Sequence, residues 1–241
     1  LSRRAGAVSP RRTPAAILIS GRGSNMQALI AGAAERDYPA EIVGVISDVP
    51  DAGGLALAAA HGVTTLALPR RDFGSKAEHE AAIDLALRDW GADIICLAGF
   101  MRMLSPGFVE RRLGQLINIH PSLLPLFRGL DTHRRALQAG VSVHGCTVHF
   151  VVPAMDEGPI IAQAAVPVSP DDTAETLGAR VLRAEHRLYA RALRWLAEGR
   201  VRMEGGRTVY SGFGVGEASA LIAPSPDIDP AHLENLARFT P

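Results

Sequence analysis

The first half of the chain alternates between short, continuously apolar runs and longer segments whose apolar positions recur with helical spacing. Continuous apolar runs are typical of central parallel strands, because helices cover both faces of such strands. These runs span residues 15–20, 42–47, 64–68, 93–99 and 115–117. Helices are predicted over residues 26–36, 54–60 and 75–90, and from residue 105 onward. The alternation predicts an α/β fold, a mostly parallel twisted sheet with helices on both faces.

The pattern changes after residue 125. In order, the predicted elements are a helix over 132–139, strands over 143–152 and 160–168, a helix over 173–198, and a hairpin over 201–210. The two strands are joined by a seven-residue loop, and strands joined by so short a loop pair antiparallel. Thr173 is the expected N-cap of the long helix. The second half therefore predicts antiparallel C-terminal strands.

The length of 241 residues suits one domain of ordinary α/β size. The first 14 residues carry four arginines, two prolines and no acid. This favours a disordered tail over an organelle transit peptide, because the prolines interrupt an amphipathic helix. We expect a tail over residues 1–14, one domain over 15–210, and a C-terminal extension over 211–241 with a weak helix near 232–238.

Charge and cysteine content limit the classes of partner. Lys plus Arg and Asp plus Glu both total 25, so no overall field attracts nucleic acid or an anionic membrane. Cys96 and Cys146 lie in apolar runs, which predicts reduced core thiols rather than a disulfide or a zinc site. No stretch reaches 18 apolar residues and no charged-then-apolar leader is present. We expect a cytoplasmic monomer or homodimer that binds neither nucleic acid nor membrane.

A glycine-rich turn, residues 21–25, lies between the first strand and the first helix. Such a turn presents backbone N–H groups to a phosphate, and the helix dipole adds to the attraction. Ser24 or Asn25 can serve as the N-cap. Met26 occupies the third glycine position of a dinucleotide fingerprint, so a monophosphate fits better than NAD. A plain tight turn explains the stretch nearly as well.

Asn118 and His120 lie at the carboxyl end of the fifth strand, just before Pro121, which has no N–H to continue the pairing. Two residues apart in extended chain, they point to the same face. Ligands of α/β sheets bind at this end of the strands. A carboxamide that can donate to an oxyanion, beside an imidazole that can transfer a proton, suits acyl transfer. From these residues alone, a turn-capping Asn and a space-filling His are an equally good interpretation.

Asp156 lies in the loop between the two later strands, which has a proline at each edge. If the strand over 143–152 lies near the fifth strand, Asp156 can reach His120 and favour its charged form. The alternative is a solvated loop carboxylate. His144 and His149 are five residues apart, so they face opposite sides of their strand and make a poor pair of metal ligands. We expect core or turn positions for both histidines.

Five blocks of sequence occur in an order that resembles one enzyme family. They span residues 21–25, 97–106, 118–125, 144–150 and 155–161. From about Ala15 to Tyr210, the chain closely resembles phosphoribosylglycinamide formyltransferase, the folate-dependent enzyme of purine (IMP) synthesis. The resemblance implies a Rossmann-like formyltransferase fold. It also implies transfer of a formyl group from 10-formyltetrahydrofolate, as co-substrate, to the amine of glycinamide ribonucleotide (GAR), without a metal.

The resemblance implies a role for each matching residue. The catalytic residues would be Asn118, His120 and Asp156. The ribose 5′-phosphate of GAR would be held by Gly23, Ser24 and Asn25, and its amine by Glu185. The folate contacts would be Lys76, Met101, Arg102, Met103, Leu104 and Asn118, with residues 152–156 as a lid. In this chemistry Asn118 and protonated His120 stabilise a tetrahedral oxyanion, and Asp156 keeps His120 charged and oriented.

Three positions depart from the family pattern. Lys76 lies where the family often has Arg, which keeps the charge but loses the bidentate fork. In the stretch 126–131, many relatives have a Pro before Gly129 and a His where this chain has Asp131, so the shape of this loop is an open question. Cys146 replaces a Thr of some relatives, and we expect it to pack rather than react.

Three other functions fit parts of the pattern. A 10-formyltetrahydrofolate hydrolase uses water in place of the amine, but such relatives carry an extra N-terminal domain and typically His where this chain has Pro121. Methionyl-tRNA formyltransferase needs an additional RNA-binding domain, for which the residues after 216 are too few. A non-catalytic folate- or nucleotide-binding protein has no use for Asn118, His120 and Asp156 together. Formyl transfer to GAR remains the favoured interpretation.

Overall fold

The computed structural model describes residues 12–213. Most of the expected tail and C-terminal extension, including the weak helix near 232–238, lies outside the described residues. Within them, the predicted mixed α/β sheet is confirmed: the strands follow the order β3-β2-β1-β4-β5-β6-β7. Neighbours from β3 to β5 pair parallel, whereas β5 with β6 and β6 with β7 pair antiparallel. A separate antiparallel hairpin is formed by β8 and β9.

The strands agree with the apolar runs to within a few residues. They are β1 (Thr13–Ile19), β2 (Ala40–Ser47), β3 (Thr65–Ala67), β4 (Ile94–Leu97), β5 (Leu116–His120), β6 (Val143–Phe150), β7 (Ile160–Pro167), β8 (Val201–Glu204) and β9 (Arg207–Tyr210). β1 begins two residues earlier than the predicted domain boundary. Thr13 and Pro14 pair with Ala40 and Glu41 of β2, and Pro14 contributes its carbonyl, which accepts from Asp93 N at 2.9 Å.

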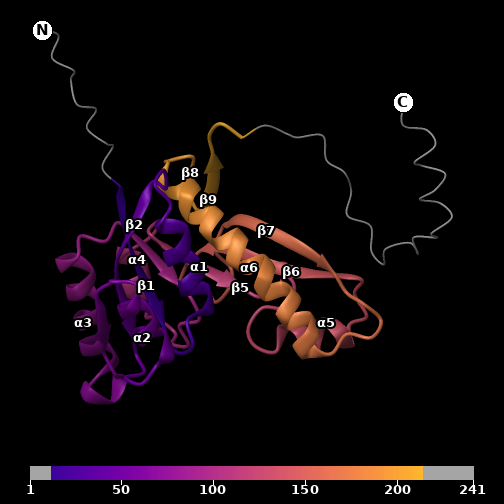
Figure 1. The fold of residues 1–241 in the computed structure, drawn as a ribbon, viewed down its shortest axis with the longest axis horizontal. Helices are drawn as coiled ribbons and strands as arrows, with labels where there is room; N and C mark the ends of the chain where they lie inside the picture. The colour runs from indigo at the N-terminus through magenta and orange to yellow at the C-terminus, as the bar shows by residue number, and fades with distance from the viewer. Residues whose placement is uncertain (1–11, 214–241) are drawn as a thin grey trace, which may run out of the picture.

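Helices cover both faces of the sheet, as predicted. They are α1 (Ser24–Ala33), α2 (Gly53–Ala60), α3 (Lys76–Asp89), α4 (Pro106–Arg111), α5 (Thr132–Gln138) and α6 (Ala174–Ala197). One buried cluster joins Ile17 of β1 to α1 and α6, which lie side by side across the sheet (Figure 1). A second joins Leu18 of β1 to α3 and α4. The alternation of β1 residues between the two clusters explains why its sequence is apolar throughout.

The long helix α6 is anchored to the middle of the sheet by Tyr189. This side chain is fully buried, and its hydroxyl lies 3.0 Å from the carbonyl oxygen of Leu97 in β4 and 3.1 Å from that of Ile117 in β5. Burial raises the pKa of Tyr189 well above its ordinary value, so the hydroxyl remains a donor. Within residues 12–213, no helix combines the length and apolar composition that a membrane span requires.

The first residues of the helices can be compared with the predicted N-caps. Thr173 caps α6, as expected, in a capping box with Thr176. Ser105 caps α4 ahead of Pro106, at the start predicted for this helix. The prediction that Ser24 or Asn25 caps α1 is wrong. The N-cap is Gly23, whose backbone is left-handed with φ of 74°, and no side chain caps this helix. The N-terminal turn of α1 therefore offers bare backbone N–H groups.

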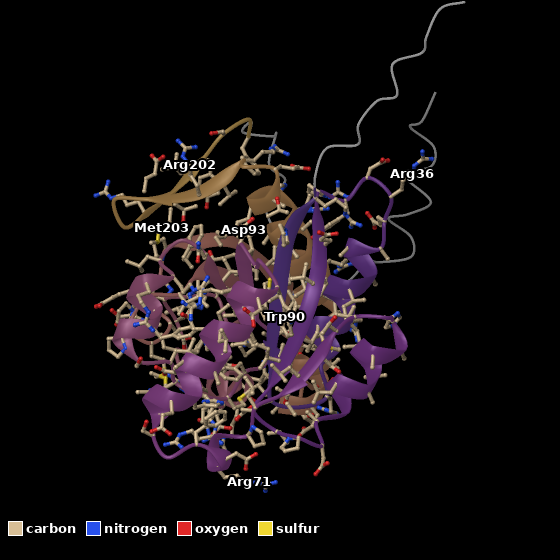
Figure 2. The ribbon with its side chains drawn as sticks, turned by 90° about the vertical axis from the view of Figure 1, so that its left-hand side faces the viewer. Arg36, Arg71, Trp90, Asp93, Arg202 and Met203 are labelled. Atoms are coloured by element: carbon tan, nitrogen blue, oxygen red, sulfur yellow. The ribbon has the colours of Figure 1, made fainter. Side chains whose placement is uncertain are left out.

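The two ends of the sheet differ. Arg71, which follows β3, lies at the opposite end of the molecule from Arg202 of β8 and away from Asp93, which precedes β4 (Figure 2). The carboxyl ends of the parallel strands therefore lie away from the terminal hairpin. In α/β sheets this is the end at which ligands bind.

Candidate active site

Four polar side chains stand on one face where β5 and β6 pair. Asn118 lies directly opposite His149, and His120 lies opposite Thr147. Directly opposed residues of an antiparallel pair project to the same side of the sheet. β5 ends at His120, as Pro121 predicts. His120, Thr147 and His149 are buried, and Asn118 is partly buried.

Asp156 completes this face from the loop between β6 and β7. Its Oδ2 lies 3.4 Å from Nδ1 of His120 and accepts from the backbone N–H of Gly129 at 2.9 Å. The sequence predicted that Asp156 can reach His120 if the strand over 143–152 lies near the fifth strand. This is confirmed, because β6 pairs with β5 and the carboxylate lies beside His120. The loop is held close to the sheet at Gly158, where a Cβ would lie only 1.6 Å from the carbonyl oxygen of Phe150.

Both ring nitrogens of His120 face acceptors. Nε2 lies 3.1 Å from the carbonyl oxygen of Phe127, and Nδ1 faces the carboxylate of Asp156. A carbonyl can only accept, so Nε2 carries a proton. The ring of His120 is therefore flanked by the Phe127 carbonyl on one side and by the Asp156 carboxylate on the other.

His149 has the opposite character and orients Asn118. Burial lowers the pKa of His149, so the ring is neutral near pH 7. Its Nδ1 donates to the carbonyl oxygen of Phe150 at 2.8 Å, which leaves Nε2 as an acceptor for Asn118 Nδ2 at 3.1 Å. This contact uses one amide hydrogen of Asn118. The second hydrogen remains available to an oxygen in front of the strand.

The surrounding loops contain unusual backbone geometry. Phe127, Asp131 and Asp156 are the non-glycine residues with positive φ among residues 12–213, at 54°, 57° and 54°. Left-handed backbone is unfavourable for a bulky residue such as Phe, and it is concentrated at functional sites. Phe127 supplies the carbonyl that faces His120, and Asp131 is the N-cap residue of α5. This answers the open question about the loop 126–131, which bends toward His120.

Two of the residues expected to hold GAR, Asn25 of α1 and Glu185 of α6, contact each other. Nδ2 of Asn25 donates to Oε2 of the buried Glu185 at 2.7 Å. Burial raises the pKa of Glu185, and the hydrogen bond from Asn25 opposes this shift. Oδ1 of Asn25 is buried and has no hydrogen-bond partner within residues 12–213. A buried polar atom of this kind fits a site that receives a polar ligand.

The five side chains expected to contact folate, other than Asn118, line a single pocket of about 300 Å³. Its lining residues are Arg70, Lys76, His79, Glu80, Phe100, Met101, Arg102, Met103 and Leu104. Met101 and Met103 are largely exposed. Lys76 Nζ lies 3.8 Å from Glu80 Oε1 and is half exposed, so this cation is loosely held. The pocket does not include His120 or Asp156.

Comparison with known proteins agrees with this geometry. The model of the formyl transferase family matches residues 14–193. The chain belongs to the formyl transferase family.

Phosphoribosylglycinamide formyltransferase of Haemophilus influenzae is 42% identical over 189 residues, which cover 78% of this formyl transferase and 89% of that protein. The trifunctional purine biosynthetic protein adenosine-3 of Bos taurus is 48% identical over 204 residues, and the chain spans about a fifth of its length (84% of this chain, 20% of that protein). Among solved structures, the phosphoribosylglycinamide formyltransferase of Brucella melitensis has 59% sequence identity to this chain and a TM-score of 0.76. The match covers 78% of this chain and 96% of that one.

One residue of this formyl transferase site was missed from sequence. His149 was expected to fill core or turn space, and it is buried, but it also contacts Asn118 and lies 3.8 Å from Oδ1 of Asp156. The only sequence signal was its odd spacing from His144, which placed the two on opposite faces without saying which face holds Asn118. His144 lies on the other face of the strand, where its Nε2 is 3.3 Å from Nδ1 of His133.

The remaining site predictions concern cysteines and metals. Cys96 and Cys146 are free and fully buried, and burial raises the pKa of each thiol to about 12. A thiol in this state is unreactive near neutral pH, which agrees with a packing role. Among residues 12–213, no group of three or more His, Cys, Asp or Glu side chains is arranged to hold a metal ion.

Proposed function

We propose that the protein transfers a formyl group from 10-formyltetrahydrofolate to the amine of GAR, a step of purine (IMP) synthesis. The observation that carries the proposal is the convergence of His120, Asp156 and Asn118, brought together by the pairing of β5 with β6. The family match and the names of the similar proteins support the substrate pair. The formyl donor is a co-substrate, so it leaves as tetrahydrofolate in every cycle.

The reaction begins when the amine nitrogen attacks the formyl carbon. A new C–N bond forms and the carbonyl oxygen becomes an oxyanion, which the free amide hydrogen of Asn118 and the protonated His120 stabilise. The attacking nitrogen loses a proton, the bond from carbon to N10 breaks, and N10 gains a proton. Protonated His120 gives a proton to N10 and is reprotonated by the proton that the attacking nitrogen releases. Asp156 orients His120 and favours its charged form before and after this exchange.

The contact between His120 Nε2 and the Phe127 carbonyl has a consequence for this mechanism. That N–H must be released before it can donate to the oxyanion, so the loop 126–131 has to shift when substrates bind. The left-handed backbone of Phe127 makes this conformation costly to hold, which favours an exchangeable contact.

The substrates are proposed to approach from two sides. The N-terminal turn of α1, at Gly23, Ser24 and Asn25, receives the ribose 5′-phosphate on backbone N–H groups. Glu185 receives the amine end of GAR. The folate occupies the pocket beside Met101–Leu104 and Lys76, with residues 152–156 as its lid. Alignment of the two substrates supplies much of the rate by proximity.

The test is to mix the protein with 10-formyltetrahydrofolate and follow its absorbance with and without GAR. Turnover that requires GAR, with formylated GAR as the product, is expected. Equal loss of the formyl group without GAR would instead identify a hydrolase, in which water replaces the amine. Absence of turnover in both mixtures, together with measurable folate binding, would identify a binding protein.

A further inference from the structure

A hydrogen-bonded group built around one buried carboxylate lies between the two proposed substrate regions. It consists of Ser20, Asp48, Met101 and Arg102, which we call the Asp48 node. Asp48 is buried, at 5% exposure; the Ser20 hydroxyl donates to its Oδ1, and Arg102 Nε donates to its Oδ2 at 2.6 Å. The Ser20 oxygen in turn accepts from the backbone N–H of Met101 at 2.8 Å.

The Asp48 node joins segments that follow three neighbouring strands. Ser20 follows β1, Asp48 follows β2, and Met101 and Arg102 follow β4, and the sheet order places β1 between the other two. Ser20 also leads directly into the glycine turn at Gly21–Ser24, whereas Met101 and Arg102 begin the pocket wall. The node therefore connects the proposed phosphate turn to the proposed folate wall.

Burial and charge make this connection stiff. A carboxylate at this depth is costly unless it is paired and hydrogen-bonded, and Arg102 supplies the compensating charge. Ser20 uses its single hydroxyl hydrogen on Asp48, so its lone pairs are available to Met101. The wall is thereby fixed at both the backbone of Met101 and the side chain of Arg102, although Met101 itself is 71% exposed.

We propose that Asp48 is a positioning residue for the formyl donor, through Ser20 and Arg102. Asp48 touches neither substrate; it presets the wall Met101–Leu104 so that folate binding does not have to order that wall. Preorganisation of this kind increases affinity by lowering the ordering cost of binding. The inference rests on the proposed function, because it assumes that the pocket beside this wall receives folate.

The test compares Asp48→Ala with the matched control Asp51→Asn. Asp51 lies three residues away in the same loop, is exposed, and makes no hydrogen bond or ion pair within the described part of the chain. Loss of two hydrogen bonds to a charged group is expected to raise KM for 10-formyltetrahydrofolate by about tenfold or more. KM for GAR is expected to change less than about threefold, since the α1 turn keeps its own contacts. The control is expected to match the wild type.

Two further variants separate positioning from a general loss of stability. Asp48→Asn keeps an acceptor for Arg102 but loses the charge and the bond from Ser20, so its donor KM is expected to lie between wild type and Asp48→Ala. Ser20→Ala removes both the bond to Asp48 and the link to Met101, but leaves the pairing of Asp48 with Arg102. Combined with Asp48→Ala it is expected to add little, because members of one hydrogen-bonded group are not additive. The Kd of a stable 10-formyltetrahydrofolate analogue, measured at equilibrium for the same variants, compares donor affinity without turnover.

The outcomes distinguish the two proposals. An active wild type whose Asp48→Ala and Asp48→Asn variants keep the donor KM of the control would overturn the positioning role and leave the formyl transfer intact. An equal rise in both substrate KM values would also overturn it, because a structural defect affects both sites alike. A wild type that neither turns over nor binds the analogue would overturn the proposed function, and the positioning role with it.

Discussion

The parallel and antiparallel parts of the sheet contribute to the site in different ways. In the parallel part, the candidate binding groups directly follow their strands: the glycine turn follows β1 and the Met101–Leu104 wall follows β4. In the antiparallel part, His149 lies within β6 and Asp156 lies in the loop after it, and both reach Asn118 and His120 only because β6 pairs with β5. Local sequence therefore encodes the candidate binding groups, whereas strand pairing assembles the candidate catalytic groups.

The loops of the two parts also differ. The turn at Gly23 takes its left-handed backbone on a glycine, at little cost. The antiparallel part takes left-handed backbone on Phe127, Asp131 and Asp156, where side chains make it unfavourable. The antiparallel part therefore holds the strained backbone, and it holds it beside the candidate catalytic residues. Substitutions in the antiparallel part should therefore reduce kcat, and those in the parallel part should raise KM.

The largest expected effect is that of His120→Ala. Removing both an oxyanion donor and the proton carrier is expected to lower kcat by about 10³–10⁴. Binding of a folate analogue should persist within a few-fold of wild type. His61→Ala, an exposed histidine that follows α2, is the matched control. Near-wild-type turnover of His120→Ala would contradict the mechanism.

Asp156→Asn tests whether the carboxylate acts through its charge. The amide keeps an acceptor for the Gly129 N–H but presents no anion to Nδ1 of His120, so kcat is expected to fall by about 10². Glu157→Gln is the control, since this neighbouring carboxylate is exposed and pairs with Arg128. The measurement is steady-state kcat of both variants. Equal kcat values would show that the charge of Asp156 does not contribute to catalysis.

Acid should destabilise the antiparallel part first. Burial lowers the pKa of His144 to about 4 and also lowers the pKa values of His133 and His149. Below pH 6.5 the unfolded chain binds protons that the folded chain does not, so stability falls as pH decreases from 6.5 toward 4. The loss from His144 alone is expected to be about 1–2 kcal/mol between pH 7 and pH 5.

Urea unfolding at both pH values, compared between wild type and His144→Gln, measures this loss. His61→Gln changes an exposed histidine and should leave the pH dependence of the unfolding free energy as it is in the wild type. Hydrogen exchange at pH 5 should increase in β6 before it increases in β1. The opposite order would contradict the assignment of acid sensitivity to the antiparallel part.

The smallest expected effect concerns the orientation of Asn118. His149→Phe removes the acceptor that holds Nδ2, and one neutral hydrogen bond of this kind corresponds to about fivefold in kcat. His149→Gln, whose amide oxygen can replace Nε2 as the acceptor, is expected to recover most of the rate. Recovery that is no better with Gln than with Phe would show that His149 only fills space.

Much of the fold follows from local sequence. The apolar runs that became β1, β4 and β5 are covered on both faces. Thr173, Ser105 and Pro121 set element boundaries by hydrogen bonds that they make or cannot make. The cap of α1 was predicted wrongly because Asn25 has a better partner in Glu185, which is 160 residues away. A local rule cannot take account of such a distant competitor.

The same division applies to the site. The sequence by itself determined which chemical groups stand at the strand ends, since the order of residues Asn118, His120 and Pro121 dictates a shared face and a stop. Only the tertiary structure decided that Asp156 meets His120, that His149 rather than His144 faces Asn118, and that Asp48 joins the segments after β1, β2 and β4. The physical reason is that these contacts depend on strand register and neighbouring strand order, which many separate segments set together.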